Sequence, residues 1–196
     1  MSSYAPRRVS GLALQHQVES LFLKNIRQKS YHSISVSELC RQAGIARKSF
    51  YNHYPTKDAC FGAIIECMIE DSILYTDEHL PAHASMAQFY HVYLEYWKAQ
   101  KWFLDIIHEN QLQHIFVQQN IQHILKEDKT VLQLLRTSDA KPDMDVLQVY
   151  ASSEATLLMQ WHSRGYDTPV EEMAQKYIRL IHSPILPPLE DGQIQW

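Results

Sequence analysis

The fold is decided by the stretch from Ser35 to Asp58, SVSELCRQAGIARKSFYNHYPTKD. Ser35 followed three residues later by Glu38 fits a capping box, in which each side chain accepts a hydrogen bond from the other residue's backbone N–H. The helix that begins there ends at Gly44, because glycine adopts the left-handed conformation of a helix end at little cost. Residues 46–53 form a second short helix. The stretch therefore predicts two short helices joined by a tight turn.

The sequence on both sides of this stretch is helical in pattern as well. Apolar residues recur at spacings of three and four, whereas the alternation typical of a strand is absent. The clearest later helix start is Thr168 to Glu171, which combines an N-cap, a first-turn proline and a capping-box glutamate. We expect helices over residues 12–29, 35–43, 46–53, from 57, from 85, 101–111, about 113–136, about 142–164 and 169–182. The sequence thus predicts an all-α protein of about nine helices.

Composition excludes several classes of protein. With 45% hydrophobic residues the chain can form a core, which excludes wholesale disorder, and five glycines are few for a turn-rich β fold. Three cysteines make no disulfide framework and suit a reducing cytoplasm. No apolar run approaches the roughly 18 residues of a membrane span. We therefore expect a cytoplasmic protein that does not enter a membrane.

Charge is divided unevenly along the chain. Residues 1–60 hold nine lysines and arginines against three acids, so they carry +6, while residues 61–196 carry −10 of the total of −4. Such a contrast indicates that the two parts meet different partners, although chance clustering of solvated charges is the simpler alternative. We expect four segments: a flexible arm at 1–10, a helix-turn-helix domain at 11–60, a helical domain at 61–183 and a tail at 184–196.

The second short helix has the composition of a DNA-recognition helix. Phe50 should point inward, toward Leu39 and Ala43 of the first short helix. The outward residues are then Arg47, Lys48, Ser49, Tyr51, Asn52 and His53. A short helix fits the major groove, where such side chains reach phosphates and base edges. The alternative is a solvated helix pair in an ordinary bundle, which a glycine between helices does not by itself exclude.

The stretch from Ser35 to Asp58 resembles the DNA-binding signature of TetR-family transcriptional regulators. The likeness lies in the order of a hydroxyl cap, a short helix ending in Ala-Gly, a hydrophobic turn residue and an aromatic recognition helix. An aromatic residue and a lysine then lead into the next helix. The resemblance covers residues 12–72. It implies a three-helix DNA-binding domain followed by a helical domain for ligand binding and dimerisation.

The resemblance also implies roles for individual residues. Tyr51 and His53 match positions that usually contact DNA phosphates, and Lys57 matches a lysine that holds another phosphate together with the N-terminus of its helix. The residues most suited to contacting bases are Arg47, Lys48 and Ser49. At position 46 the family often has a serine or threonine, but this chain has Ala46. Alanine has no hydroxyl, so a side-chain cap or phosphate contact at this position is lost.

The C-terminal part, from Leu158 to Ala174, resembles the Firmicutes-type branch of that family, which includes regulators of dihydroxyacetone utilisation. By analogy, the helices at about 143–164 and 169–182 pair with their copies in a four-helix dimer interface. The residues expected there are Ala151, Ser152, Ala155, Met159, Tyr177 and Ile178. The small residues Ala151, Ser152 and Ala155 would allow two helices to approach closely, but small residues also serve ordinary packing.

An aromatic group in the second part is a candidate effector pocket. Its members are Phe89, Tyr93, Tyr96, Trp97, Trp102 and Phe103. Aromatic rings supply apolar area with few polar groups, and Asp105 or Glu109 could face a cationic effector. The alternative is that these residues form the core.

Other functions are less well supported by the sequence. Eleven histidines, including His79 and His83, raise the alternative of a metal-responsive regulator, but Pro81 disfavours a helix that would bring those two together. Redox sensing through Cys40, Cys60 or Cys67 has little support. No nucleophile elbow, phosphate-binding loop or dinucleotide motif is present, so we predict no enzyme, catalytic residue, metal site or cofactor.

Taken together, the sequence predicts a homodimeric transcriptional regulator, a repressor, that binds a pseudo-palindromic operator in double-stranded DNA and responds to a small effector. A helical module that binds a protein partner without specific DNA binding is the competing class. A steep salt dependence of duplex binding would separate the two, because only contacts with phosphates release counterions.

Overall fold

The computed structural model describes residues 13–126 and 144–182, and within these ranges it contains helices and no strand. The elements are α1 (Ala13–Ile26), the 3₁₀ turn η1 (Tyr31–Ser33), α2 (Val36–Ala43), α3 (Arg47–His53), α4 (Lys57–His79), α5 (Met86–Ala99), α6 (Lys101–Glu109), α7 (Gln113–Leu125), α9 (Met144–Ser163) and α10 (Val170–His182). The described part thus holds nine α-helices, which confirms the all-α prediction. The expected arm at 1–10, the tail at 184–196 and the helical turns expected around Pro142 lie outside the described residues.

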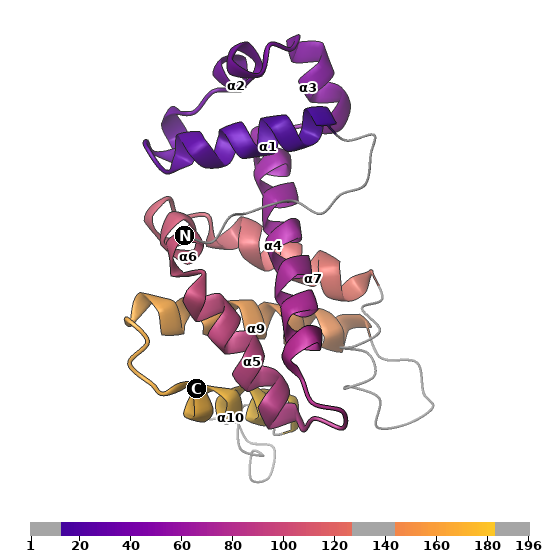
Figure 1. The fold of residues 1–196 in the computed structure, drawn as a ribbon, viewed down its shortest axis with the longest axis vertical. Coiled ribbons are helices and arrows are strands. Elements are labelled where there is room, and N and C mark those ends of the chain that lie inside the picture. The colour runs from indigo at the N-terminus through magenta and orange to yellow at the C-terminus, as the bar shows by residue number, and fades with distance from the viewer. Residues whose placement is uncertain (1–12, 127–143, 183–196) are drawn as a thin grey trace, which may run out of the picture.

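The helices α1, α2 and α3 gather at one end of the molecule, and α4 leads from them into the second domain (Figure 1). There α5 and α7 pack against α4, α9 packs mainly against α7, and α10 packs mainly against α5. The boundary predicted at residue 60 therefore falls within α4, which takes part in both regions. Among the described residues, no helix is long and apolar enough to cross a membrane.

The core is continuous from one region to the other. Phe61 of α4 lies 5.8 Å from Phe22 of α1 and 6.1 Å from Phe103 of α6, measured between ring centroids. All three rings are fully buried. The three-helix unit is consequently attached to the second domain by packed aromatic surface as well as by the chain itself.

Two glycines end helices as the sequence predicted. Gly44 has φ of 64° and Gly165 has φ of 68°, both in the left-handed region. Beyond them, the N–H of Ile45 donates to the Cys40 carbonyl and that of Tyr166 to the Trp161 carbonyl, each at 3.0 Å. These bonds satisfy carbonyls that the helix end leaves open.

One predicted cap is only half correct. Ser35 accepts from the backbone N–H of Glu38 at 3.1 Å, as expected, but the Glu38 carboxylate does not return to Ser35. Its two oxygens instead accept from Lys29 Nζ, each at 2.6 Å, because a charged donor is a stronger partner than a neutral backbone N–H. At α5, in contrast, Ser85 and Gln88 complete the reciprocal box.

Candidate nucleic-acid interface

The recognition helix α3 is fixed by one buried side chain. Phe50 is fully buried and packs at 5.4 Å from the ring of Tyr54, while Leu39 and Ala43 of α2 are buried in the same core. Ile45 in the turn is half-buried and packs against it. The inward orientation predicted for Phe50 therefore agrees with the structure.

The opposite face of α3 is open to solvent. Arg47, Lys48, Tyr51, Asn52 and His53 are exposed, and Ser49 is half-buried. Six side chains that donate hydrogen bonds or carry positive charge are thus presented together, in the composition that suits a phosphate-lined groove.

Arg47 and Tyr51 meet one turn apart on this face. The Arg47 guanidinium carbon lies 5.9 Å from the centroid of the Tyr51 ring, and Nη2 donates to the hydroxyl at 3.5 Å. Ala46, just before the helix, supplies no side-chain cap, and the backbone bond from Ser49 N to the Ala46 carbonyl at 2.9 Å forms the first turn.

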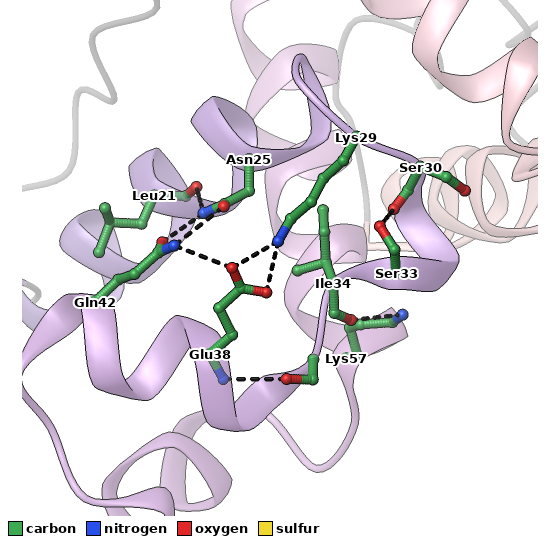
Figure 2. Close-up of polar contacts among 10 residues, drawn as sticks. Leu21, Asn25, Lys29, Ser30, Ser33, Ile34, Glu38, Gln42 and Lys57 are labelled. Atoms are coloured by element: carbon green, nitrogen blue, oxygen red, sulfur yellow. Dashed lines mark hydrogen bonds and ion pairs between the residues drawn. The ribbon is translucent and has the colours of Figure 1, made fainter.

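A polar network joins α1 to α2 (Figure 2). Asn25 Nδ2 donates to Gln42 Oε1 at 2.6 Å and to the Leu21 carbonyl at 2.7 Å, and Gln42 Nε2 donates to Glu38 Oε1 at 3.3 Å. The ion pair of Glu38 with Lys29 completes it. Sequence reasoning missed this network, although the four-residue spacing of Glu38 and Gln42 on one helix face was visible.

Lys57, the expected phosphate contact at the start of α4, is already bonded within the chain. Its Nζ donates to the carbonyls of Tyr31 at 2.9 Å and Ile34 at 3.1 Å, and it lies 4.0 Å from the centroid of the Tyr31 ring. Burial lowers the pKa of Lys57, and the neighbouring Asp58 opposes that effect. An ammonium group has three N–H donors, so one stays available for a phosphate.

A buried carboxylate also supports this unit. Glu19 of α1 is 1% exposed and accepts from the Tyr54 hydroxyl at 2.6 Å, directly after α3. A hydrogen bond to a buried ionised group is among the stronger ones. This contact fixes the end of the recognition helix against α1.

The aromatic group predicted as an effector pocket lies in the packed interior. Phe89, Tyr93, Tyr96, Trp97 and Phe103 are buried, and Trp102 is half-buried, with the Arg27 guanidinium 3.9 Å from its ring centroid. Asp105, considered as a contact for a cationic effector, is bonded to Lys101 Nζ at 2.6 Å and lies 3.2 Å from His162 Nε2. A cavity of about 350 Å³ opens elsewhere, between α5 and α10.

A tyrosine cluster inside the second domain was not foreseen from the sequence. The hydroxyls of Tyr90 and Tyr150 are hydrogen-bonded to each other, and that of Tyr177 donates to the Glu154 carbonyl at 3.0 Å. Burial, and then the nearby Glu154 carboxylate, raises the pKa of Tyr90 and Tyr150. The residues come from α5, α9 and α10, so no local spacing indicates that they meet.

Most residues predicted for a dimer interface are buried inside the protomer. Ala151, Ala155, Met159 and Tyr177 are between 0% and 5% exposed, and Ser152 and Ile178 are half-buried. Ala151, Ala155 and Met159 of α9 and Tyr177 of α10 pack within their own domain in the protomer, so their place in a dimer interface stays a prediction. The exposed apolar side chains of α9 are instead Met144, Val146 and Val149.

The histidine and cysteine alternatives gain nothing from the structure. Helix α4 ends at His79, and His83 has φ of 68° beyond it, so the two do not share a helix face. No group of three or more His, Cys, Asp or Glu side chains suited to a metal occurs among the described residues. Cys40, Cys60 and Cys67 are buried and are not joined in disulfides.

A short helix with an exposed basic and aromatic face, supported by two helices, defines a helix-turn-helix protein of the transcription-regulator class. Residues 23–64 match the family model described as "Bacterial regulatory proteins, tetR family". The match covers the two short helices and the start of α4, and it confirms the resemblance found in this part of the sequence. No curated protein matches the chain.

Solved structures extend the likeness over the second domain. The structure of Lin0861 from Listeria innocua aligns at 19% identity over 90% of this chain and 96% of that one, with a TM-score of 0.64. The fatty acid degradation regulator FadR from Bacillus halodurans aligns at 11% identity over 91% and 98%, with a TM-score of 0.52. These likenesses show a shared fold.

A third match carries the name "Dihydroxyacetone kinase operon activator DhaS". It aligns at 19% identity over 88% of this chain and 96% of that one, with a TM-score of 0.48.

Proposed function

We propose that the chain is a sequence-specific transcriptional repressor that binds a pseudo-palindromic operator as a homodimer and responds to a small effector. The observation that carries the proposal is the exposed face of α3, held outward by the buried Phe50 on the basic part of the chain. A helix so exposed can enter the major groove while the preceding helix lies along the backbone.

Within this proposal the residues of α3 divide by chemistry. Tyr51 and His53 contact phosphates, and Lys57 contributes its remaining N–H to another phosphate. Arg47 and Lys48 are long enough to reach base edges, where they pair best with the acceptors of guanine. Ser49 and Asn52 donate hydrogen bonds to bases or to the backbone.

Two arguments support the homodimer. An operator made of two half-sites needs two recognition helices, one from each copy, and the second domain exposes an apolar surface. Val146 and Val149, three residues apart on one face of α9, are 63% and 60% exposed. Two exposed apolar side chains on one helix face suit contact with another protein surface. We propose that this face of α9, rather than the side bearing Ala151 and Ala155, meets the second copy.

The effector is proposed to enter the second domain beside α5. The cavity between α5 and α10 has the size of a small-molecule site and is lined by apolar side chains and a few polar groups. Ala87, Val92 and Ala174 supply apolar surface, and His91 and Glu171 are polar groups at its edge. The cavity is lined by α5, the helix that also carries Phe89 and Tyr93. A ligand that displaces α5 would therefore also move these two buried side chains.

Fluorescence anisotropy with duplex DNA from upstream of the gene tests the proposal. We expect tight binding at low salt and a steep loss of affinity as salt rises.

Two variants test the residue roles in the same assay. Lys57→Ala should weaken binding to all sequences and flatten the slope of log affinity against log salt concentration by about one unit per protomer. Lys48→Ala should lose about 1–3 kcal/mol of discrimination between operator and altered operator. A chain that binds no duplex at low salt is not a DNA-binding regulator.

A further inference from the structure

A residue of the second domain is hydrogen-bonded to the turn that precedes α2. Asn110, directly after α6, accepts from the backbone N–H of Tyr31 through Oδ1 at 2.7 Å. Its Nδ2 donates to the Ile106 carbonyl at 2.9 Å, which fixes the orientation of the amide. Asn110 is 9% exposed and Tyr31 is 4% exposed, so water does not readily replace this bond.

The same turn holds Lys57. The Tyr31 carbonyl accepts from Lys57 Nζ at 2.9 Å, and the Ile34 carbonyl at the end of the turn accepts at 3.1 Å. The two backbone groups of Tyr31 therefore connect Asn110 on one side with Lys57 on the other. This connection runs from the second domain to the residue proposed to contact a DNA phosphate.

The placement of the turn determines where the free N–H of Lys57 points. A lysine has a flexible four-carbon stem, and two fixed carbonyl acceptors are what orient its ammonium group. The turn itself is a 3₁₀ helix of three residues with weaker internal bonds than an α-helix. An external bond to the Tyr31 N–H thus contributes to holding both carbonyls in position.

We propose that Asn110 is a positioning residue for DNA binding: through the Tyr31 N–H it fixes the turn whose carbonyls orient Lys57 toward a phosphate. The inference rests on the proposed function, in which Lys57 makes that contact. Asn110 itself touches no DNA. Its contribution appears only through Lys57, so it affects the number of phosphate contacts rather than the choice of bases.

The test compares the salt dependence of duplex binding in four variants of the full chain. Asn110→Ser removes the reach to Tyr31 but keeps a hydroxyl able to bond the Ile106 carbonyl. Asn120→Ser is the matched control, because Asn120 is also buried and donates to the carbonyl four residues earlier, that of Phe116 at 2.8 Å. Lys57→Ala gives the slope without the contact.

Asn110→Ser should flatten the salt slope by about one unit per protomer, as Lys57→Ala does. The double variant Asn110→Ser with Lys57→Ala should lose no more than Lys57→Ala alone, since both changes remove one contact. Asn120→Ser should keep the slope of the unchanged chain. Circular dichroism confirms in each case that the helices are intact.

Two results would overturn the inference while leaving the proposed function in place. One is an unchanged slope in Asn110→Ser when Lys57→Ala flattens it. The other is equal flattening in Asn120→Ser, which would mean that any buried asparagine of the second domain has this effect. Absence of duplex binding by the unchanged chain would instead refute the proposed function itself.

Discussion

The three-helix unit and the second domain are held together in different ways. In the first, polar side chains join the helices: the network of Asn25, Gln42, Glu38 and Lys29 links α1 to α2, and Glu19 accepts from Tyr54. In the second, large aromatic rings from α5, α6, α7 and α10 fill the interior. A small helical unit buries limited apolar area, so directional bonds contribute to its geometry, whereas the larger domain has apolar area to spare.

The comparison shows which part of the molecule needs a precisely fixed orientation. A recognition helix must keep its orientation to the groove, and hydrogen bonds with charged groups fix angles that apolar contacts leave freer. The four predictions below measure how far this difference extends, beginning with the feature that the two regions share, a fully buried phenylalanine.

Phe50→Ala should have the largest effect, a loss of about 3–5 kcal/mol in the free energy of unfolding, because it removes a fully buried ring beneath α3. Phe116→Ala, in the equally buried interior of the second domain, should cost a similar amount. Urea denaturation followed by circular dichroism gives both values. A loss below about 1 kcal/mol at Phe50 would show that polar bonds alone sustain the first region.

Tyr54→Phe should cost about 1.5–3 kcal/mol, since it leaves the buried Glu19 carboxylate without this donor. Tyr177→Phe in the second domain removes a hydroxyl that donates to the neutral Glu154 carbonyl, and it should cost only about 1 kcal/mol. The same denaturation experiment measures both. Equal losses would remove the distinction between charged polar bonds in the first region and neutral ones in the second.

Lys29→Met should cost about 0.2–1 kcal/mol, because its ion pair with Glu38 is partly exposed to solvent. Methionine keeps the apolar part of the lysine stem, so the change reports mainly on charge. Repeating the denaturation in 1 M salt should shrink the difference between the variant and the unchanged chain. A difference that does not respond to salt would mean that packing of the stem matters more than the ion pair.

His162 gives the smallest predicted effect, and it depends on pH. Burial lowers the pKa of His162, with Asp105 acting in the opposite direction. The folded state therefore binds fewer protons than the unfolded state, in which the pKa of a histidine is about 6.5. The contribution of the neutral imidazole to the free energy of unfolding is fully present above the unfolded-state pKa, and it is lost as the pH falls through the folded-state pKa.

The unchanged chain should accordingly lose more stability between pH 7.5 and pH 5.5 than His162→Gln does. Urea midpoints at the two values provide the measurement. A steeper loss in His162→Gln would reverse the sign and would mean that Asp105 stabilises the charged imidazole more than burial destabilises it.

The sequence predicted what depends on local signals. Gly44 and Gly165 end their helices, and Phe50 points inward, because each of these follows from a residue type at a fixed place in a helical pattern. The partner of Glu38 could not be predicted in the same way. Lys29 lies on the far side of a turn, and only the folded arrangement of α1 and α2 brings the two together.

The second domain was harder to predict for a similar reason. Small residues such as Ala151 and Ala155 suit a close contact with any helix, and the sequence does not say whether that helix belongs to the same chain. The cluster of Tyr90, Tyr150 and Tyr177 comes from three helices, so its existence depends on tertiary packing. Local periodicity identifies a buried face but not what lies opposite it.

The three buried cysteines can report local unfolding of the protein. Cys40 is in α2, Cys60 near the start of α4 and Cys67 in its middle, and all are at most 5% exposed. Burial raises the pKa of the Cys40 and Cys60 thiols, so they react slowly with alkylating reagents while the helices around them stay closed. The order in which the thiols are labelled over time therefore records which part of the chain opens first, without an introduced probe.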